Sequence, residues 1–458
     1  MKRRKFIRNL GLGTAATIGV PYLLPTGRLY ASSGVRKANH VVFCLFAGGV
    51  RNLESVHKND GNLMPYTLKG AEGISSDIIS GINFVPQNTG ITLQEQGTLY
   101  KEFRMKYGPT GHYGAHATAM TGVYTGENLN INANPQYPTI FELYRKHNSP
   151  SMSAKNAWWV SNSLGAYAHL NYSTYEGYGP DYGANYIQPA SIISQKGFDN
   201  LGNSRVYSST EEEKIKELRG FCDSHFSSQY NGAANSITNT EEDKIEIEEF
   251  INQCFIEAAN GQFDDPWRID TSLYNNDMRT VHFAEKIIQE YKPELLVVNM
   301  QDVDIAHSNF TLYVNNIQKA DYALAHLWET IQNTPGMMND TILIAMPEHG
   351  RNQDGNGLYD NFGREALDHT NDDYSREIFS LILGPSGIVV QNQVFSQEKG
   401  ESIDIVPTIA NVLGFDNDIP GGLLMGSVLN ESFYKDEESI IFICYFCCYF
   451  NKLYRRRL

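Results

Sequence analysis

Four short apolar runs, each bordered by polar residues, restrict the fold of this chain more than any other feature of its sequence. Runs of this length are typical of strands that are buried on both faces of a parallel sheet. Between the second and third runs, residues 313–331 repeat apolar side chains at spacings of three and four, which predicts a helix that covers such a sheet. Strand, helix and strand in this order predict an α/β protein with a mostly parallel central sheet. The predicted strands are residues 41–46, 295–300, 341–346 and 378–383.

The 458 residues exceed the usual size of one compact domain. We therefore predict one large α/β domain over residues 38–430, with an insertion of about residues 160–285 that forms a cap over the carboxyl edge of the sheet; two closely packed lobes are the alternative. Within the insertion, capping sequences at residues 210–213 and 239–242 predict the starts of two helices. Residues 404–413 predict a further helix near the end of the domain.

The chain begins with a basic segment, Lys-Arg-Arg-Lys-Phe-Ile-Arg at residues 2–8, followed by a modestly apolar run that contains Gly and Ala. This order resembles a twin-arginine export signal, and the small residues 31–33 suit a cleavage site. We predict that residues 1–31 are a signal peptide, that the twin-arginine export machinery is a partner, and that the protein is periplasmic or secreted. A basic arm followed by a short core helix is the alternative interpretation.

The formal charge of −15 argues against nucleic acid as a partner, because contacts to phosphate groups need Lys and Arg. Six of the 37 basic residues lie in the predicted signal, so the remaining chain is more acidic still. Residues 435–458 differ in composition from the rest, and their apolar run is too short to span a bilayer as a helix. We predict no stable membrane span and a disordered tail at residues 435–458.

Metal-ligand residue types gather where the predicted strands end. A carboxylate or imidazole follows the second run, follows the third run and precedes the fourth. Each group alone also fits a structural role, as a hydrogen-bonded histidine or a capping aspartate, but three groups at one sheet edge favour a divalent metal site. Zinc is the first choice, with manganese and calcium as alternatives. The predicted ligands are Asp302, Asp304, His307, Glu348, His349 and His369.

The order of these motifs resembles that of the alkaline phosphatase superfamily, which includes sulfatases, over roughly residues 38–430. Asp304 (or Asp302) with His307 resembles the superfamily's Asp-plus-His element. Glu348-His349-Gly350 resembles its Asp-His-Gly, and His369 resembles its late histidine. The resemblance implies a three-layer sandwich, two metal positions and hydrolysis of phosphate or sulfate esters.

Two further segments carry the resemblance without supplying metal ligands. Residues 121–124 resemble the Thr-Gly-x-Tyr that follows the nucleophile's helix, and residues 402–415 resemble the closing Asp-Ile-x-Pro-Thr helix. The second of these is the match most specific to the fold.

The chain departs from the superfamily pattern at the metal position that activates the nucleophile. Residues 47–51 contain no carboxylate, and His112 stands where a hydroxyl nucleophile is expected, although Thr110 and Thr118 are close. Glu348 replaces an aspartate, and the spacing from Asp to His differs by one. We therefore expect a one-metal site that activates water directly.

His112 suits a ligand, a general base or a transient nucleophile. His116 follows four residues later, so the two histidines share one face of a helix, where they also suit a core or capping role. Arg351 and Arg51 follow strands and suit a clamp for an anionic group, or a surface role. The predicted catalytic residues are His112, His116 and Arg351.

The sequence thus predicts an exported metal-dependent hydrolase that acts on a small-molecule or glycan ester of phosphate or sulfate. The alternative is a member that has lost hydrolysis and binds a glycan or another envelope component. An aromatic stretch motivates the alternative, because such rings stack on sugars, although aromatic residues in a cap more often pack against each other. Its residues are Trp158, Trp159, Tyr172, Tyr175, Tyr178 and Tyr182.

Overall fold

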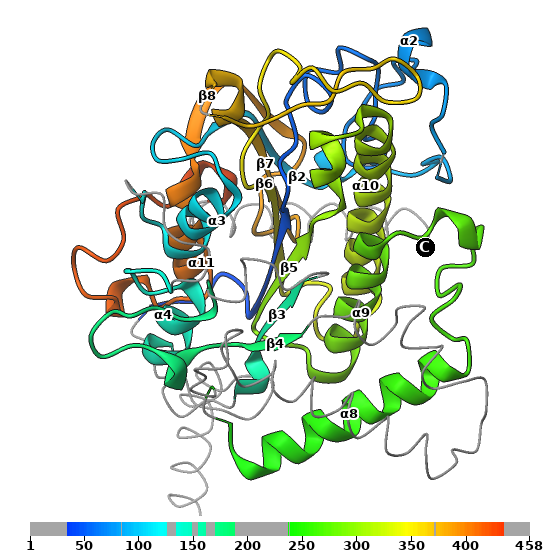
Figure 1. Ribbon diagram of the computed structural model, residues 1–458. Coiled ribbons are helices and arrows are strands. Elements are labelled where there is room, and N and C mark those ends of the chain that lie inside the picture. The colour runs from blue at the N-terminus through cyan, green and yellow to red at the C-terminus, as the bar shows by residue number, and fades with distance from the viewer. Residues whose placement is uncertain are drawn as a thin grey trace, which may run out of the picture.

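The computed structural model places an eight-stranded sheet between two layers of helices, which is the three-layer α/β arrangement expected from the sequence (Figure 1). The order of the strands is β4-β3-β5-β1-β6-β7-β2-β8. The predicted signal at residues 1–31, the tail at residues 435–458 and the helix start at residues 210–213 lie outside the described residues. The structure describes residues 34–83, 85–125, 134–148, 154–161, 170–187, 237, 239–370 and 372–434.

The centre of the sheet is parallel and completely buried. β1 pairs in parallel with β5 on one side and with β6 on the other, so that Val42 lies opposite both Leu296 and Leu343. Every residue of these three strands is buried, as the apolar runs predict. The strands are β1 (His40–Phe46), β2 (Gly97–Arg104), β3 (Ala157–Ser161), β4 (Asn185–Ile187), β5 (Leu295–Met300), β6 (Thr341–Pro347), β7 (Glu377–Leu383) and β8 (Gln393–Glu401).

The fourth predicted strand, β7, is antiparallel to β6, so the prediction that it runs parallel is wrong. β6 ends at the site, and the chain stays at that edge, because Gly350 donates its backbone N–H to the carbonyl of Ser375 just before β7 begins. A strand that starts where its neighbour ends must run in the opposite direction. An all-apolar run gives no sign of its direction when both faces of the sheet are covered.

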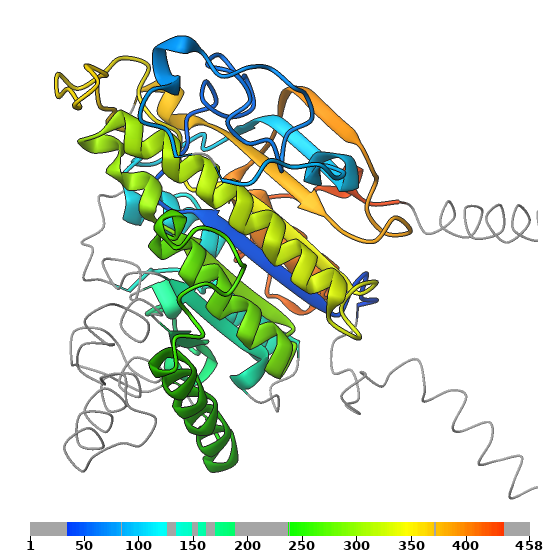
Figure 2. The ribbon, with the colours of Figure 1, turned by 90° about the vertical axis from the view of Figure 1, so that its right-hand side faces the viewer.

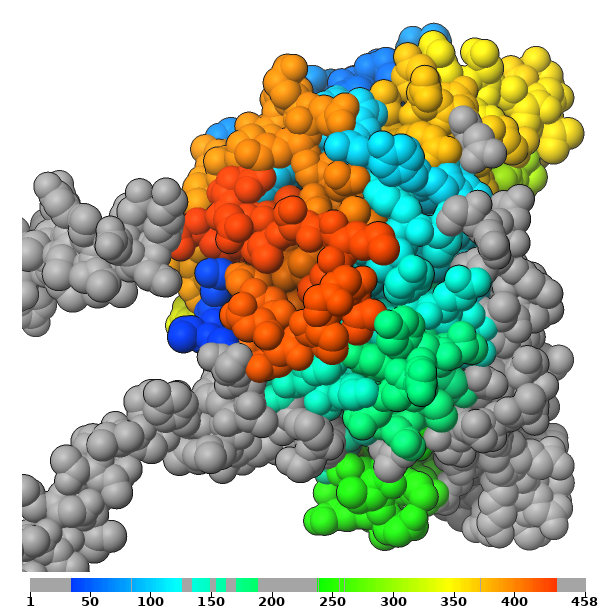
Figure 3. All heavy atoms as spheres, turned by 90° about the vertical axis from the view of Figure 1, so that its left-hand side faces the viewer, coloured from blue at the N-terminus to red at the C-terminus, as the bar shows by residue number. Residues whose placement is uncertain are grey.

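The side chains of β1 alternate between two cores. Val42 and Cys44 face one core with α9 (Asn276–Tyr291) and α10 (Phe310–Asn333), whereas Val41 and Phe43 face the other, formed with α3, α4 and α11. Figure 2 shows α9 and α10 side by side across one face of the sheet. Figure 3 shows the opposite face, where the segments around α4 and α11 lie in contact. The helices of that face are α3 (His112–Thr121), α4 (Ile140–His147) and α11 (Ile405–Val412).

Two elements within the predicted insertion, β4 and α9, belong to the sandwich itself. A third, α8 (Glu241–Ala259), begins at Thr240 as its capping sequence predicts, with the Thr240 side chain accepting the N–H of Asp243. It packs on the side of the sandwich and not over the carboxyl edge. Lys155, just before β3, lies 3.3 Å from Asp243, and Phe250 packs edge-on against Trp158. Among the described residues, no helix is long and apolar enough to cross a membrane.

Candidate metal centre

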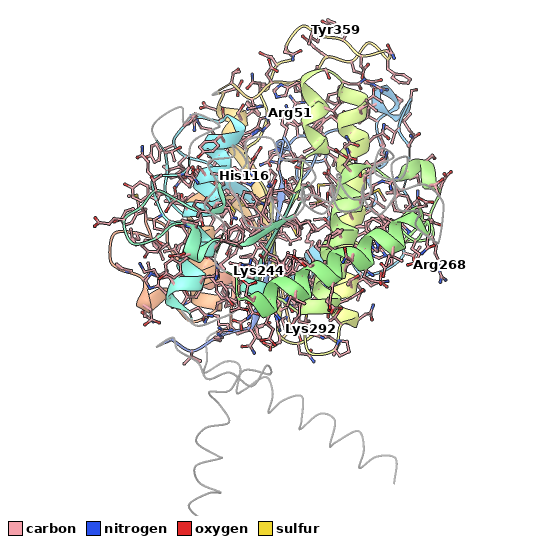
Figure 4. The ribbon with its side chains drawn as sticks, turned by 60° about the horizontal axis from the view of Figure 1, so that its bottom comes forward. Arg51, His116, Lys244, Arg268, Lys292 and Tyr359 are labelled. Atoms are coloured by element: carbon pink, nitrogen blue, oxygen red, sulfur yellow. The ribbon has the colours of Figure 1, made fainter. Side chains whose placement is uncertain are left out.

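The carboxyl ends of the central strands and the first turn of α3 form the candidate site. β5 leads into a 3-10 helix, Asp302–His307, and β6 ends directly before Glu348. His112 is the first residue of α3, and Gly111 before it supplies no side-chain cap. Figure 4 shows His116 of α3 and Arg51, which follows β1, in the upper half of that view, away from α8. Parallel strands bring their carboxyl ends to one edge, which explains why groups so distant in sequence meet here.

The first group of ligand-type atoms consists of His112, Asp304, His307 and His369, whose candidate atoms all lie within 4.8 Å of one another. The Nε2 atoms of His307 and His369 are 2.9 Å apart. Asp304 Oδ1 lies 3.2 Å from His307 Nε2 and 3.1 Å from His112 Nε2. Four side chains from three separate segments therefore point at one small volume.

Outer partners fix the protonation of two of these rings. His307 Nδ1 is 2.6 Å from Asp368 Oδ1, and His369 Nδ1 is 2.7 Å from the carbonyl oxygen of Thr110. Both oxygens only accept hydrogen bonds, so each Nδ1 carries a proton. Burial and neighbouring cationic groups lower the pKa of His369, so its Nε2 carries a lone pair. His307 Nε2 lies between this lone pair and the Asp304 carboxylate, where a proton or a cation stabilises the arrangement.

A second group consists of His112, Glu348 and His349. His349 Nδ1 donates to the carbonyl of Gly350 at 2.6 Å, which leaves a lone pair on its Nε2. That Nε2 is 3.3 Å from Glu348 Oε1 and 3.2 Å from His112 Nδ1. The side chains of Glu348 and His349 are 0% exposed, and a carboxylate buried to this degree needs a positive partner.

His116 supports this second group from behind. Its Nδ1 donates to Glu348 Oε2 at 2.6 Å, and its Nε2 accepts from the side-chain amide of Asn299 at 3.1 Å. Both ring nitrogens are used and the residue is fully buried, with its ring stacked near Trp159. His116 and His112 contact the same carboxylate, as their spacing on one helix face predicts. The geometry places His116 behind Glu348, where its hydrogen bond orients that carboxylate.

The electrostatics of the site favour positive charge. Burial acts to raise the pKa of Asp304, but hydrogen bonds from His112 and His307 outweigh it and hold that pKa well below its ordinary value. Burial also acts to raise the pKa of Glu348, but hydrogen bonds from His112 and His116 outweigh it and lower that pKa. Burial lowers the pKa of His112, yet its bonds to both carboxylates raise the pKa to about 9. Without a metal, the site therefore holds two carboxylates around one imidazolium.

Asp302 does not join either group, which corrects its prediction as a ligand. Its Oδ2 accepts the backbone N–H of Asn276 at 2.8 Å and of Asp277 at 3.2 Å, at the start of α9. A carboxylate is stabilised at a helix N-terminus by the unpaired backbone donors there. Of the two aspartates considered from the sequence, Asp304 is the one that reaches the site.

Neither predicted arginine clamp faces open space. Arg351 is 0% exposed, and its guanidinium donates to the carbonyls of Gly49 and Leu367 and to Asp304 Oδ1 at 3.2, 2.8 and 3.0 Å. Arg51 pairs with both carboxylate oxygens of Glu54, at 2.8 and 2.6 Å. The two arginines tie the strand-end loops together, so the prediction that either holds a substrate anion is not supported by their geometry.

Three supporting residues of the site were not predicted from the sequence: Asp368, Asn299 and Gly49. A Cβ at Gly49, whose φ is +82°, would lie 2.3 Å from His349 Nδ1. The glycine stands in the segment where the superfamily carries an aspartate, and its missing side chain gives His349 its place. Asp368 directly precedes His369, which was the only sequence signal for its role.

The sequence matches no family model. A protein of the alkaline phosphatase superfamily from Vibrio parahaemolyticus is 12% identical at a TM-score of 0.45, over 90% of this chain and 74% of that one. Wild-type alkaline phosphatase PafA is 10% identical at 0.46, over 88% and 100% of the two chains. The PsFucS1 sulfatase from Pseudoalteromonas sp. is 11% identical at 0.43, over 94% and 75%. The chemistry of the site rests on the residues of this chain alone.

Proposed function

We propose that the protein is an exported metal-dependent hydrolase of phosphate or sulfate esters. The observation that carries the proposal is the convergence of Asp304 Oδ1 with the Nε2 atoms of His307 and His369, which their outer partners aim at one another. Ligand histidines of metal sites are held in this way, through the other ring nitrogen.

The donor set fits a divalent metal held by Asp304, His307 and His369, with His112 as a fourth ligand. Imidazole and carboxylate donors in this number suit zinc, whereas calcium and magnesium favour oxygen donors alone. A metal bound there lowers the pKa of water and polarises an ester oxygen. Of the two groups, this one is the more exposed, since the side chains of Asp304 and His307 are 41% and 38% exposed, whereas those of Glu348 and His349 are 0% exposed. A substrate must therefore approach from its side.

The residues around the site make water the nucleophile. The Thr110 hydroxyl donates to the carbonyl of His369 at 2.7 Å, and the Thr118 hydroxyl donates to the carbonyl of Gly114 at 2.9 Å. Both threonines are buried and occupied, and His112 stands where a hydroxyl would be. In a single step, the water oxygen bonds to phosphorus or sulfur, the ester bond breaks, and a water proton passes to the departing alkoxide.

The alternative of a glycan-binding protein loses part of its motivation in the structure. Trp158 and Trp159 are 0% exposed and Tyr172 is 3% exposed, so these rings cannot stack on a sugar. Tyr175, at 38%, is the most exposed ring of the stretch. The export signal and the small-molecule or glycan nature of the ester are parts of the proposal that the sequence alone supports.

A direct assay tests the proposal. The purified mature protein is incubated with 4-nitrophenyl phosphate and 4-nitrophenyl sulfate, before and after removal of metal by a chelator and after return of zinc. We expect cleavage of at least one ester, loss on chelation and recovery with zinc. Thr118→Ala should keep the activity and Asp304→Asn should abolish it. Metal binding without cleavage of any phosphate or sulfate ester would contradict the proposal and favour a binding protein.

A further inference from the structure

One side chain, His112, belongs to both groups of ligand atoms. Its Nε2 faces the first group, 3.1 Å from Asp304 Oδ1. Its Nδ1 faces the second, 2.7 Å from Glu348 Oε1 and 3.2 Å from His349 Nε2. The two nitrogens of one imidazole point in different directions, so a single ring reaches two separate volumes.

Each volume has acceptors of its own. The first holds Asp304 Oδ1 and the Nε2 nitrogens of His307 and His369, and the second holds Glu348 Oε1 and the lone pair of His349. Backbone carbonyls accept a hydrogen bond from Nδ1 of both His369 and His349, so the Nε2 lone pair of each ring stays directed into its own group. The two groups touch, because the rings of His349 and His369 stack with centroids 4.0 Å apart.

We propose that His112 bridges two divalent cations, one in each group, with Nε2 as ligand to the first and Nδ1 as ligand to the second. The inference rests on the proposed function, in that a cation binds here, and goes beyond it in the bridge that His112 makes between the two groups. Binding of both cations releases both ring protons of His112 to solvent, so the bridge is an imidazolate.

The ligand count makes the bridge necessary for the second cation. Without His112, the second group offers only Glu348 and His349, fewer than the three or four protein ligands usual for zinc. The imidazolate adds a ligand and a negative charge beside the Glu348 carboxylate. Because both of those side chains are 0% exposed, a cation there has no open face toward substrate and acts only through the shared ring.

Copper provides the test, since Cu²⁺ binds imidazole strongly and carries an unpaired electron. Metal-free, full-length protein is titrated with Cu²⁺. The number of copper ions bound per chain is then compared with the number of unpaired spins per chain, obtained by integrating the electron paramagnetic resonance signal. We expect two coppers per chain and an integrated signal well below two spins, because an imidazolate bridge couples the spins antiferromagnetically. His112→Ala should bind one copper with a full signal.

His57→Ala is the matched control, because His57 also pairs with a carboxylate, Glu102 at 2.6 Å, but lies outside both groups. It should behave as the wild type. One copper per wild-type chain, or two with full spin intensity, overturns the bridge and leaves the proposed function standing. A wild-type protein that retains no metal overturns both. The spin count of the wild type decides the question even where His112→Ala fails to fold.

Discussion

His307 and His369 meet through their Nε2 nitrogens, which lie 2.9 Å apart. Each ring is held in this position by an oxygen at its far side, Asp368 for His307 and the carbonyl of Thr110 for His369. Two imidazole nitrogens fixed in this way, with the Asp304 carboxylate beside them, suit a bound cation.

The first prediction separates the two aspartates that the sequence left open. Asp304→Asn removes the carboxylate at the centre of the first group, and we expect the purified protein to lose its retained zinc. Asp302→Asn is the matched control, because its side chain caps α9 and reaches neither group. Elemental analysis after dialysis measures both. Loss of zinc from the Asp302 variant, or its retention in the Asp304 variant, would contradict the assignment.

The fold was largely predictable because its signals are local. β1, β5 and β6 are predominantly apolar runs, and α10 carries a regular apolar stripe, so each is recognisable without knowledge of its neighbours. The direction of β7 was not predictable, because it depends on where the preceding loop leaves the chain.

The site was predictable in its residue types but not in its contacts. Of the six ligands predicted from residue types at strand ends, the structure brings five together. Asp302 is the exception, and it differs from Asp304 only in the direction in which the 3-10 helix points its side chain. The position of Arg351 in the sequence suggests an anion clamp, and only the structure shows that its guanidinium already donates to backbone carbonyls. Such roles depend on long-range packing, which no local pattern encodes.

A second prediction concerns Asp368, which accepts from His307 Nδ1 at 2.6 Å. Asp368→Asn weakens this support and frees the ring to turn or change tautomer, so zinc affinity should fall by about 10- to 100-fold. Competition with a zinc chelator of known affinity measures the change. Asp372→Asn, which alters a carboxylate that caps a nearby short helix, should leave the affinity within about twofold of wild type. Equal affinities for wild type and Asp368→Asn would refute the supporting role.

A third prediction uses two glycines with nearly the same backbone. Gly49 has φ +82° and Gly357 has φ +85°, so alanine is strained at both by about 1–2 kcal/mol. At Gly49 the new Cβ also meets His349 Nδ1 at 2.3 Å, whereas at Gly357 nothing lies within 4 Å. Gly49→Ala should therefore disturb metal binding, and Gly357→Ala should not. Zinc content and thermal unfolding of the two variants, measured together, separate strain from displacement of His349; matched zinc content would contradict the prediction.

The last prediction concerns a carboxylate remote from the site. Asp321 of α10 is fully buried and accepts the backbone N–H groups of Tyr66 and Thr67, each at 2.8 Å. Burial raises its pKa to about 7, although these hydrogen bonds oppose the change. The folded state thus binds a proton that the unfolded chain has already lost, so this contribution to stability is complete below about pH 4 and disappears as the pH rises through 7.

Asp321→Asn removes the titrating group, so the free energy of unfolding of the variant should fall less than that of the wild type between about pH 4 and 7. The difference in slope integrates to roughly 4 kcal/mol, since each pKa step is worth about 1.4 kcal/mol. Urea unfolding of wild type and variant at several pH values, in the presence of a chelator, measures it. Other titrating groups cancel in the comparison, and the lost hydrogen bond shifts the variant by a constant at every pH. Parallel curves for the two proteins would show that Asp321 is ionised in the folded state throughout this range, held by the two backbone donors alone.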